Sequence, residues 1–425
     1  MTPLVHDSLT SWLTHLETLH SQTIELGLER VRRVQTQMQL IPHCPVIVVG
    51  GTNGKGSVCA MLTAILSRAG YRVGTYTSPH LLHYNERVAL DGKPVSDATL
   101  CQSFAAVEVG RGEVSLSYFE FGTLAAVHTF MTQAVDVMVL EVGLGGRLDA
   151  VNLFDADCSV IVSVDLDHQD WLGDTREAIG YEKAGIMRAG RPAICADADP
   201  PASLLAHANS LGVPLQCIGR DFSYTHRDPV QWNFQHGATR HHSLPYPALR
   251  GAYQLQNASA ALAALDALHD QLPVGMGDIR RGLLELEWPG RFQVLPGRPL
   301  TILDVGHNPH AVRAMVASLN TLGYAERRFA VFSMLDDKDI ASVVVLAREQ
   351  FDHWFIAPLA TSRAVTIEAL STILNAQGVQ QFSVYADIAA ADQAALAKAA
   401  ENDRIVVFGS FYTVAAVLEH RKLIH

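Results

Sequence analysis

The stretch VIVVGGTNGKGS, from Val46 to Ser57, decides the fold of the first part of this chain. A run of β-branched residues gives way to glycines that carry one lysine and one serine, and residues Val58 to Ala69 then have a helical pattern. Backbone N–H groups converge on an anion only where no Cβ blocks the approach, and the positive end of a helix adds to the attraction. The stretch therefore predicts a phosphate-binding loop, with Lys55 at the β- and γ-phosphates and Ser57 facing Mg²⁺.

The match to the general nucleotide loop G-x-x-x-x-G-K-[ST] is incomplete. Gly56 stands between Lys55 and the hydroxyl residue Ser57, whereas the general pattern places Ser or Thr directly after the lysine. An ordinary glycine-rich turn is the alternative interpretation. The lysine between a strand and a helix favours phosphate binding.

Composition narrows the class of protein. The chain has 425 residues, of which 48% are hydrophobic, and a formal net charge of −11. This length predicts two or three domains with substantial cores. Nucleic-acid binding uses basic patches and none stands out, so we expect small-molecule partners. No apolar run approaches the length of a membrane span and the N-terminus lacks a signal-peptide pattern, so we expect a cytoplasmic protein away from membranes.

Apolar runs of strand length alternate with helical patterns in the first 290 residues, as in VIVVGG, RVGTYT, VDVMVLEVG, CSVIVSVD and RPAICAD. This alternation predicts an α/β fold with a doubly wound parallel sheet. Residues Asp221 to Pro247 have the aromatic and turn residues of a small antiparallel insertion. After a break at Trp288 to Arg291, a second series follows: TILDVG, FAVFSML, HWFIAPL, FSVYA and RIVVFGS. We therefore expect domains over residues 1–290 and 291–425.

Two motifs place acidic groups at strand ends. Glu141 begins EVGLGGRLDA, directly after an apolar run, and ligands of open α/β sheets bind at the carboxyl ends of strands. His168 lies among aspartates in VSVDLDHQDWLG, after another such run. Together they predict a Mg²⁺ site of carboxylate and imidazole groups, although oxygen ligands are commoner for this ion. A solvent-facing carboxylate and a structural histidine are the alternatives.

Two further motifs are ambiguous from the residues alone. Lys183, in YEKAGI, lies in a predicted helix, where a solvated lysine is the ordinary interpretation. In DVGHNPHA, Asp304 is placed to bond a ribose hydroxyl and His307 or Asn308 to touch phosphate, whereas simple capping of a helix that opens at Pro309 explains Asn308 equally well.

Eight motifs, in this order, resemble one family: GTNGKGS, TSPHL, YFEFGTL, EVGLGGRLDA, DHQDWLG, EKAGI, WPGRFQ and LDVGHNPHA. They are similar to those of the bacterial bifunctional dihydrofolate synthase/folylpolyglutamate synthases, which belong to the Mur ligase superfamily. The resemblance implies a P-loop-type ATPase domain of the Mur ligase kind followed by a smaller Rossmann-like domain. It also implies an ATP-dependent ligase that joins L-glutamate to dihydropteroate and to reduced folates through an acyl phosphate.

The same resemblance implies the site residues. ATP contacts are implied at Gly54, Lys55, Gly56, Ser57, Asn257, Arg291 and Asp304, and Mg²⁺ ligands at Ser78, Glu141 and His168. Lys183 matches a lysine that the family carbamylates, which is physically reasonable because an ammonium repels Mg²⁺ whereas a carbamate binds it. The implied catalytic residues are Lys55, Lys183 and His307. The implied dihydropteroate contacts are Thr23, Ile24, Glu25, Leu26, Ser117, Tyr118, Phe119, Glu120, Leu148, Asp149 and Ala150.

Three other functions remain open at this point. A folylpolyglutamate synthase without dihydrofolate synthase activity is the nearest alternative. A peptidoglycan Mur ligase is disfavoured, because about fifty residues precede Gly51 and a nucleotide-sugar domain needs more. A nucleotide-dependent switch protein would hold or hydrolyse ATP without glutamate. For the folate ligase we expect a monomer.

Overall fold

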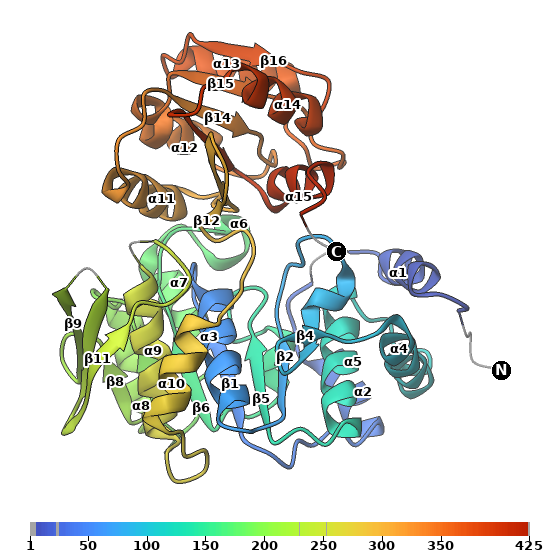
Figure 1. Cartoon of the computed structure of the whole chain (residues 1–425). Coiled ribbons are helices and arrows are strands. Elements are labelled where there is room, and N and C mark those ends of the chain that lie inside the picture. The colour runs from blue at the N-terminus through green and yellow to red at the C-terminus, as the bar shows by residue number, and fades with distance from the viewer. Residues whose placement is uncertain (1–5, 23–24, 229, 252, 424–425) are drawn as a thin grey trace. The chain divides into compact units, whose positions relative to one another are not determined.

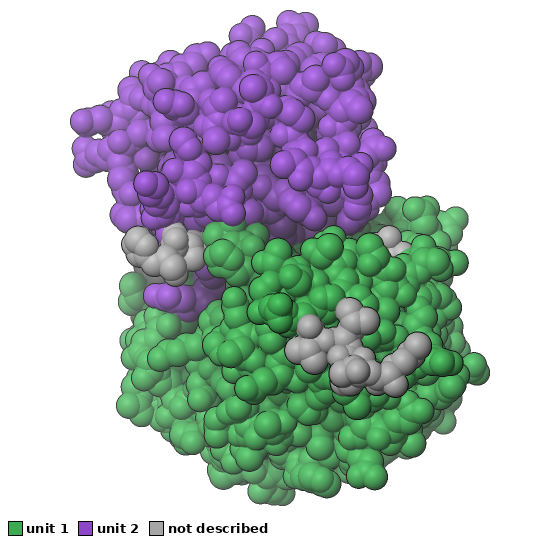
Figure 2. Space-filling model, turned by 90° about the vertical axis from the view of Figure 1, so that its right-hand side faces the viewer, with its two compact units in different colours: residues 1–248, 255–286 green, residues 249–254, 287–425 purple. Residues whose placement is uncertain are grey.

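The computed structural model describes residues 6–22, 25–228, 230–251 and 253–423 of the chain. It divides into two compact units, which Figure 2 colours separately. The first unit comprises the residues up to Ala248 together with Leu255–Leu286, and the second comprises Leu249–Gln254 and the residues from Glu287 onward. Each unit has its own sheet and its own hydrophobic core.

The first unit is built on an eight-stranded sheet in the order β4-β3-β2-β5-β1-β6-β7-β8 (Figure 1). Its strands are β1 Val46–Gly50, β2 Val73–Tyr76, β3 Val88–Leu90, β4 Lys93–Pro94, β5 Val137–Glu141, β6 Cys158–Ile161, β7 Ala193–Cys195 and β8 Leu215–Cys217. All residues of β1 and β5 are buried, as expected for central parallel strands covered on both faces. The predicted doubly wound α/β fold is confirmed, because all pairings along β2-β5-β1-β6-β7-β8 are parallel.

One edge of this sheet differs from the all-parallel expectation. Strands β3 and β4 pair antiparallel to their neighbours. They are joined by Asp91 and Gly92, which have φ angles of 51° and 76°. Positive φ at both central residues is the geometry of a two-residue hairpin, for which Asp-Gly is a strong sequence signal. This hairpin is absent from the sequence-based prediction because its strands are too short to show alternation.

Helices surround the sheet of the first unit. They are α1 Leu9–Thr18, α2 Glu29–Gln37, α3 Lys55–Arg68, α4 Asp97–Arg111, α5 Tyr118–Thr132, α6 Gln169–Leu172, α7 Arg176–Ala184, α8 Ala202–Leu211, α9 Gln254–Ala267 and α10 Met276–Leu284, with 3₁₀ turns at Tyr84–Arg87 and Ala150–Leu153. Helix α3 packs on β1, β2 and β5, and α10 packs on α3. The glycine at position 282 permits this approach, since a Cβ there would lie 2.7 Å from the Ile65 Cα.

The predicted antiparallel insertion is confirmed. Strands β9 Phe222–Asp228, β10 Gln231–His236 and β11 Thr239–Pro245 form a separate three-stranded sheet. Trp232 and Phe234 on β10 are fully buried beneath it. Buried residues alternate with half-buried ones along most of β10, whereas the central parallel strands are buried throughout, so this segment differs from them in sequence.

The second unit has a six-stranded sheet in the order β12-β13-β17-β14-β15-β16. Its strands are β12 Gln293–Leu295, β13 Leu300–Asp304, β14 Arg328–Phe332, β15 His353–Ile356, β16 Phe382–Val384 and β17 Arg404–Phe408; its helices are α11 Pro309–Thr321, α12 Ile340–Ala347, α13 Ile367–Ala376, α14 Ile388–Lys398 and α15 Phe411–His420, with a 3₁₀ turn at Arg348–Gln350. All pairings are parallel except that of β12 with β13. Over the described residues, none of the helices in either unit combines the length and apolar character that crossing a membrane requires.

Candidate active site

The predicted phosphate loop connects β1 to α3. The helix begins at Lys55, three residues before the predicted start, so that Lys55 and Ser57 lie in its first turn. Gly54 caps the helix with φ of +87°, a conformation that L side chains rarely adopt. A Cβ at this position would also lie 2.7 Å from Asn257 Oδ1. Gly54 therefore serves both the turn and the close approach of Asn257, an implied ATP contact on α9.

The loop is hydrogen-bonded to the segment that follows β6. The Thr52 N–H donates to the Ser163 carbonyl at 2.8 Å, and the Asn53 N–H donates to Ser163 Oγ at 3.1 Å. The Thr52 hydroxyl donates to the Asp165 carbonyl at 3.0 Å and accepts from the Asp165 N–H at 2.9 Å. Lys55 Nζ donates back to loop carbonyls at positions 51 and 52, at 3.0 and 3.2 Å. The ammonium therefore lies against the backbone of the loop.

The implied metal ligands lie at the same edge of the sheet as this loop. Glu141 ends β5, is 4% exposed, and pairs with Val49 of the neighbouring β1. Its Oε2 accepts the Ser78 N–H at 3.1 Å, which brings the end of β2 to the end of β5. His168 follows β6 and caps α6 with φ of 52°; its N–H donates to Asp167 Oδ1 at 2.9 Å. A buried carboxylate beside a phosphate loop fits a divalent cation that is bound together with a nucleotide.

Lys183 is buried on α7 rather than solvated. It is 4% exposed, and burial together with the positive charge of Lys55 lowers its pKa to about 7, against the opposite effects of Asp167 and Asp149. The loop after β5 covers its helix: the Arg147 N–H donates to the Glu182 carbonyl at 2.8 Å, and the Arg147 guanidinium pairs with the Glu182 carboxylate. The ordinary interpretation of a solvent-facing lysine is therefore wrong.

The described residues of the three implied substrate stretches lie together. The ring of Phe119 on α5 covers the backbone of Gly143, where a Cβ would be 2.6 Å from the ring. Phe119 thus joins residues 117–120 to the loop that contains residues 148–150. Glu120 connects residues 117–120 to the stretch around Glu25, because its carboxylate accepts from Arg30 and Arg30 also pairs with Glu25. Thr23 and Ile24 lie outside the described residues.

Several implied substrate residues have structural partners in this arrangement. Ser117 and Glu120 form a capping box at the start of α5. Asp149 accepts from the Leu144 N–H at 2.9 Å and the Val151 N–H at 2.9 Å, while burial raises its pKa to about 7. Ala150 is buried, and Leu26, Tyr118 and Leu148 are half-buried. The guanidinium of Arg87 lies over the Tyr118 ring. These implied substrate residues therefore have a structural role in the three stretches.

The implied residues of the second unit form a group of their own. Asp304 ends β13 and accepts from the Phe292 N–H at 3.0 Å and the Gly306 N–H at 2.7 Å. Burial raises its pKa to about 6, in spite of these bonds and the nearby Arg291. Arg291 lies over the Phe411 ring, 5.0 Å from its centroid, and His307 also faces that ring.

His307 and Asn308 are oriented by the backbone. Nδ1 of His307 lies 2.9 Å from the Val305 carbonyl. A carbonyl only accepts, so Nδ1 carries the proton, and Nε2 is the basic nitrogen of the neutral ring. Asn308 Oδ1 accepts from the Ala311 N–H at 2.9 Å, so it does cap α11, which begins at Pro309 as predicted.

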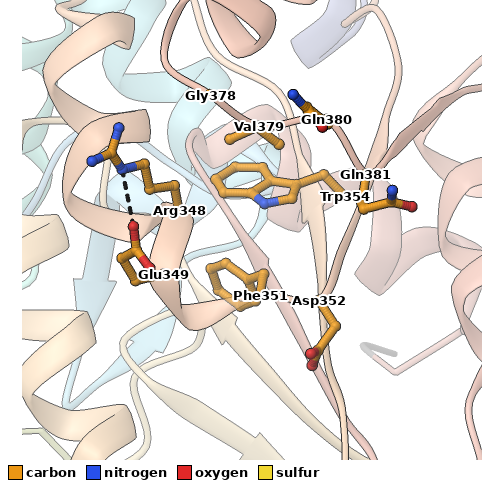
Figure 3. Close-up of a pocket in the computed structure, with 9 residues that line it drawn as sticks. All are labelled: Arg348, Glu349, Phe351, Asp352, Trp354, Gly378, Val379, Gln380 and Gln381. Carbon is orange, nitrogen blue, oxygen red and sulfur yellow. Dashed lines mark ion pairs between the residues drawn. The ribbon is translucent and has the colours of Figure 1, made fainter.

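A separate hollow of about 350 Å³ lies in the second unit beside β15 (Figure 3). Trp354 is among the residues that line it, and Arg348, another lining residue, pairs with Glu349 at 3.3 Å. The hollow contains none of the implied site residues. It carries no part of the chemistry derived above.

Two family models match the chain, one for each series of strands. The Mur ligase middle domain matches residues 49–265, and the glutamate ligase domain of Mur ligases matches residues 290–411. The dihydrofolate synthase/folylpolyglutamate synthase of Escherichia coli (strain K12) is 43% identical over 419 residues, covering 98% of this chain and 96% of that protein. The chain belongs to the dihydrofolate synthase/folylpolyglutamate synthase group of the Mur ligase family.

Solved structures of this ligase group support the same assignment. Escherichia coli FolC in complex with DHPP and ADP has a TM-score of 0.94 at 42% identity, covering 99% of each chain. A bifunctional folylpolyglutamate synthase/dihydrofolate synthase with Mn, AMPPNP and L-glutamate bound has a TM-score of 0.91 at 42% identity, covering 99% of this chain and all of that chain. The fold described here is therefore that of Mur ligases that bind nucleotide, metal and glutamate.

One residue of this ligase site has no signal in the sequence. Arg30 is absent from the implied set, yet it contacts two members of it. Its partner Glu120 lies 90 residues later. A pairing over that separation leaves no local pattern, so only the folded chain reveals it.

Proposed function

We infer that this chain is an ATP-dependent ligase that adds L-glutamate to dihydropteroate, forming dihydrofolate, and to reduced folates, forming polyglutamates. The observation that carries this inference is one sheet edge that gathers the glycine loop, the buried Glu141 and the buried Lys183 in a chain 43% identical to a bifunctional synthase. The relatives are named for both synthase activities, which favours this function over a synthase of polyglutamates alone. The glutamate ligase domain disfavours a nucleotide switch.

The loop residues handle the triphosphate. Gly54, Gly56 and Ser57 present backbone N–H groups at the positive end of α3, and Lys55 offsets charge on the γ-phosphoryl group as it moves to the substrate carboxylate. The terminal P–O bond of ATP breaks and an acyl phosphate forms. Asn257, Arg291 and Asp304 are the other proposed nucleotide contacts.

Ser78, Glu141 and His168 would hold Mg²⁺, for which the buried Glu141 carboxylate supplies the charge. When bound, this ion neutralises phosphate charge and orients the transferring group. Lys183 contributes as a carbamate. Its amine, with a pKa of about 7, is substantially neutral at neutral pH and reacts with CO₂ to give a carbamate and a proton. The conversion places a negative charge beside Lys55, which is favourable at that position.

The second half of the reaction forms the amide. The glutamate nitrogen attacks the acyl carbon, phosphate leaves, and the nitrogen loses a proton. His307 is the candidate acceptor of that proton, because its Nδ1 is committed to the Val305 carbonyl and Nε2 is its basic nitrogen. The enzyme acts as a monomer on small molecules; its net charge of −11 disfavours nucleic acid.

The test uses the purified full chain with Mg·ATP, L-glutamate and either dihydropteroate or tetrahydrofolate. ADP release and product masses are followed together. Glutamate adducts of both acceptors are expected. Adducts of tetrahydrofolate alone would leave a monofunctional synthase, and ADP release that ignores glutamate would leave a switch or hydrolase. Lys183→Ala is expected to lose most activity, and added bicarbonate is not expected to restore it.

A further inference from the structure

One guanidinium holds two carboxylates of the proposed dihydropteroate site. Arg30, on α2, donates from Nε to Glu120 Oε2 at 2.9 Å, pairs with the Glu25 carboxylate, and donates from a second nitrogen to the Glu25 carbonyl at 2.8 Å. Its side chain is 18% exposed and that of Glu120 is 5% exposed. Charge-assisted bonds of this kind are strong when they are shielded from water.

Glu25 is fixed from its other side as well. His20 Nε2 lies 2.6 Å from Glu25 Oε2, and His20 Nδ1 lies 2.7 Å from the hydroxyl of Ser115. Ser115 in turn donates to the Leu19 carbonyl at 3.1 Å. The His20 hydrogen bond and the Arg30 charge hold the pKa of Glu25 below its usual range. The chain around Glu25 is therefore tied to the segment that leads into α5 at two points.

Glu120 presents one oxygen without a partner. Its Oε2 accepts from both Arg30 Nε and the Ser117 N–H, the latter at 2.8 Å. Its Oε1 is buried and accepts no hydrogen bond from any residue within the described ranges. A buried carboxylate oxygen in this condition costs free energy until a donor reaches it. The two bonds to Oε2 determine the direction in which Oε1 points.

We propose that Arg30 is a positioning residue for the acceptor substrate. It clamps the Glu25 segment to α5 and orients Glu120 so that Oε1 accepts from an N–H group of bound dihydropteroate. This rests on the proposed function, because it takes both stretches to line the acceptor site. A lysine cannot replace the arginine, since a single ammonium lacks the planar fork that reaches two carboxylates at once.

The test compares Arg30→Met and Arg30→Lys with the matched control Arg111→Met. Arg111 forms an equally buried pair with Glu108 on α4, with side chains 12% and 9% exposed. For each folded variant, kcat and the KM for dihydropteroate and for ATP are measured. Arg30→Met is expected to raise the KM for dihydropteroate at least about tenfold, as for one lost charge-assisted bond, and to leave that for ATP within about twofold. Arg30→Lys recovers only part of the loss, and Arg111→Met changes neither KM.

Several outcomes would overturn the proposal. An unchanged KM for dihydropteroate in Arg30→Met is one, and full recovery by Arg30→Lys is another. Equal losses for ATP and dihydropteroate would reduce Arg30 to a structural role. If Arg30→Met does not fold, Glu25→Gln is used instead, because the Glu25 side chain is 42% exposed. The same selective rise in the KM for dihydropteroate is expected. Wild-type protein that adds no glutamate refutes the proposed function; normal wild-type turnover with an unaffected Arg30→Met refutes only this inference.

Discussion

Replacing Lys183 by methionine should stabilise the first unit while it removes activity. Lys183 is 4% exposed on α7, and its amine lies near the positive charge of Lys55. Methionine has a similar length and no charge, so the substitution removes the cost of a buried ammonium and keeps most of the packing. The prediction concerns the protein in CO₂-free buffer, in which no carbamate forms.

The size of the effect follows from the pKa of Lys183. Its value falls from 10.5 to about 7 on folding, and one unit corresponds to about 1.4 kcal/mol, so the full penalty approaches about 5 kcal/mol. Between pH 7 and 10.5 the unfolded chain binds more protons than the folded one, so the free energy of unfolding of the wild type rises across that window. The cost to folding stability of burying the Lys183 ammonium is complete below pH 7 and vanishes above pH 10.5. Allowing for imperfect packing of methionine, we expect a gain of about 3 kcal/mol below pH 7.

Urea titrations read by pulse proteolysis measure this gain, because cleavage sites can be assigned to the first unit. The exposed Lys93 on β4 supplies the control variant Lys93→Met, for which no pH-dependent gain is expected. Bicarbonate should stabilise the wild type and leave Lys183→Met unchanged, because only the wild type has an amine to carbamylate there. A Lys183→Met protein that is less stable than the wild type below pH 7, or a difference that does not shrink toward pH 10.5, would refute the reasoning.

Three further predictions address the nucleotide and metal sites. Gly54→Ala should abolish ATP binding, measured by calorimetry, because the new Cβ would meet Asn257 Oδ1 at 2.7 Å and φ is +87°; retained affinity would contradict the close approach. Glu141→Gln keeps an acceptor for the Ser78 N–H but removes the charge, so the Mg²⁺ concentration for half-maximal activity should rise at least about tenfold, whereas an unchanged requirement would remove Glu141 from the metal site. Asp304→Asn should flatten the pH dependence of the free energy of unfolding. The pKa of Asp304 is raised to about 6, so the free energy of unfolding of the wild type falls by about 2 kcal/mol as pH rises from about 4 through 6. If urea titrations gave the same pH dependence for both proteins, that result would count against this assignment.

Much of the fold followed from local patterns. Runs such as Val46–Gly50 and Arg404–Phe408 are entirely buried, and central parallel strands need apolar residues on both faces, so composition alone marks them. The hairpin at Asp91 and Gly92 was missed because its strands are too short for alternation to show. The start of α3 was placed too late, since glycine near a helix start disguises the first turn.

The candidate site was predictable only where chemistry and local sequence coincide. Glycines, a lysine and a hydroxyl in order identify a phosphate loop, and Glu141 at the end of an apolar run identifies a strand-end carboxylate. Lys183 offered no such pattern: its helix is ordinary in sequence, and its buried position depends on the loop after β5 that packs on α7. Resemblance to a family singled it out before the fold was known.

The sequence by itself determined the order of strands and helices, the phosphate loop and the family, because these depend on residues that lie close together in the chain. Only the tertiary structure decided which charges are buried and which groups meet. Lys183 loses its solvation because α7 is covered by the loop after β5, and Arg30 meets Glu120 because α2 lies beside α5 in the fold. Burial and long-range pairing arise when distant segments pack together, and for that reason no local pattern records them.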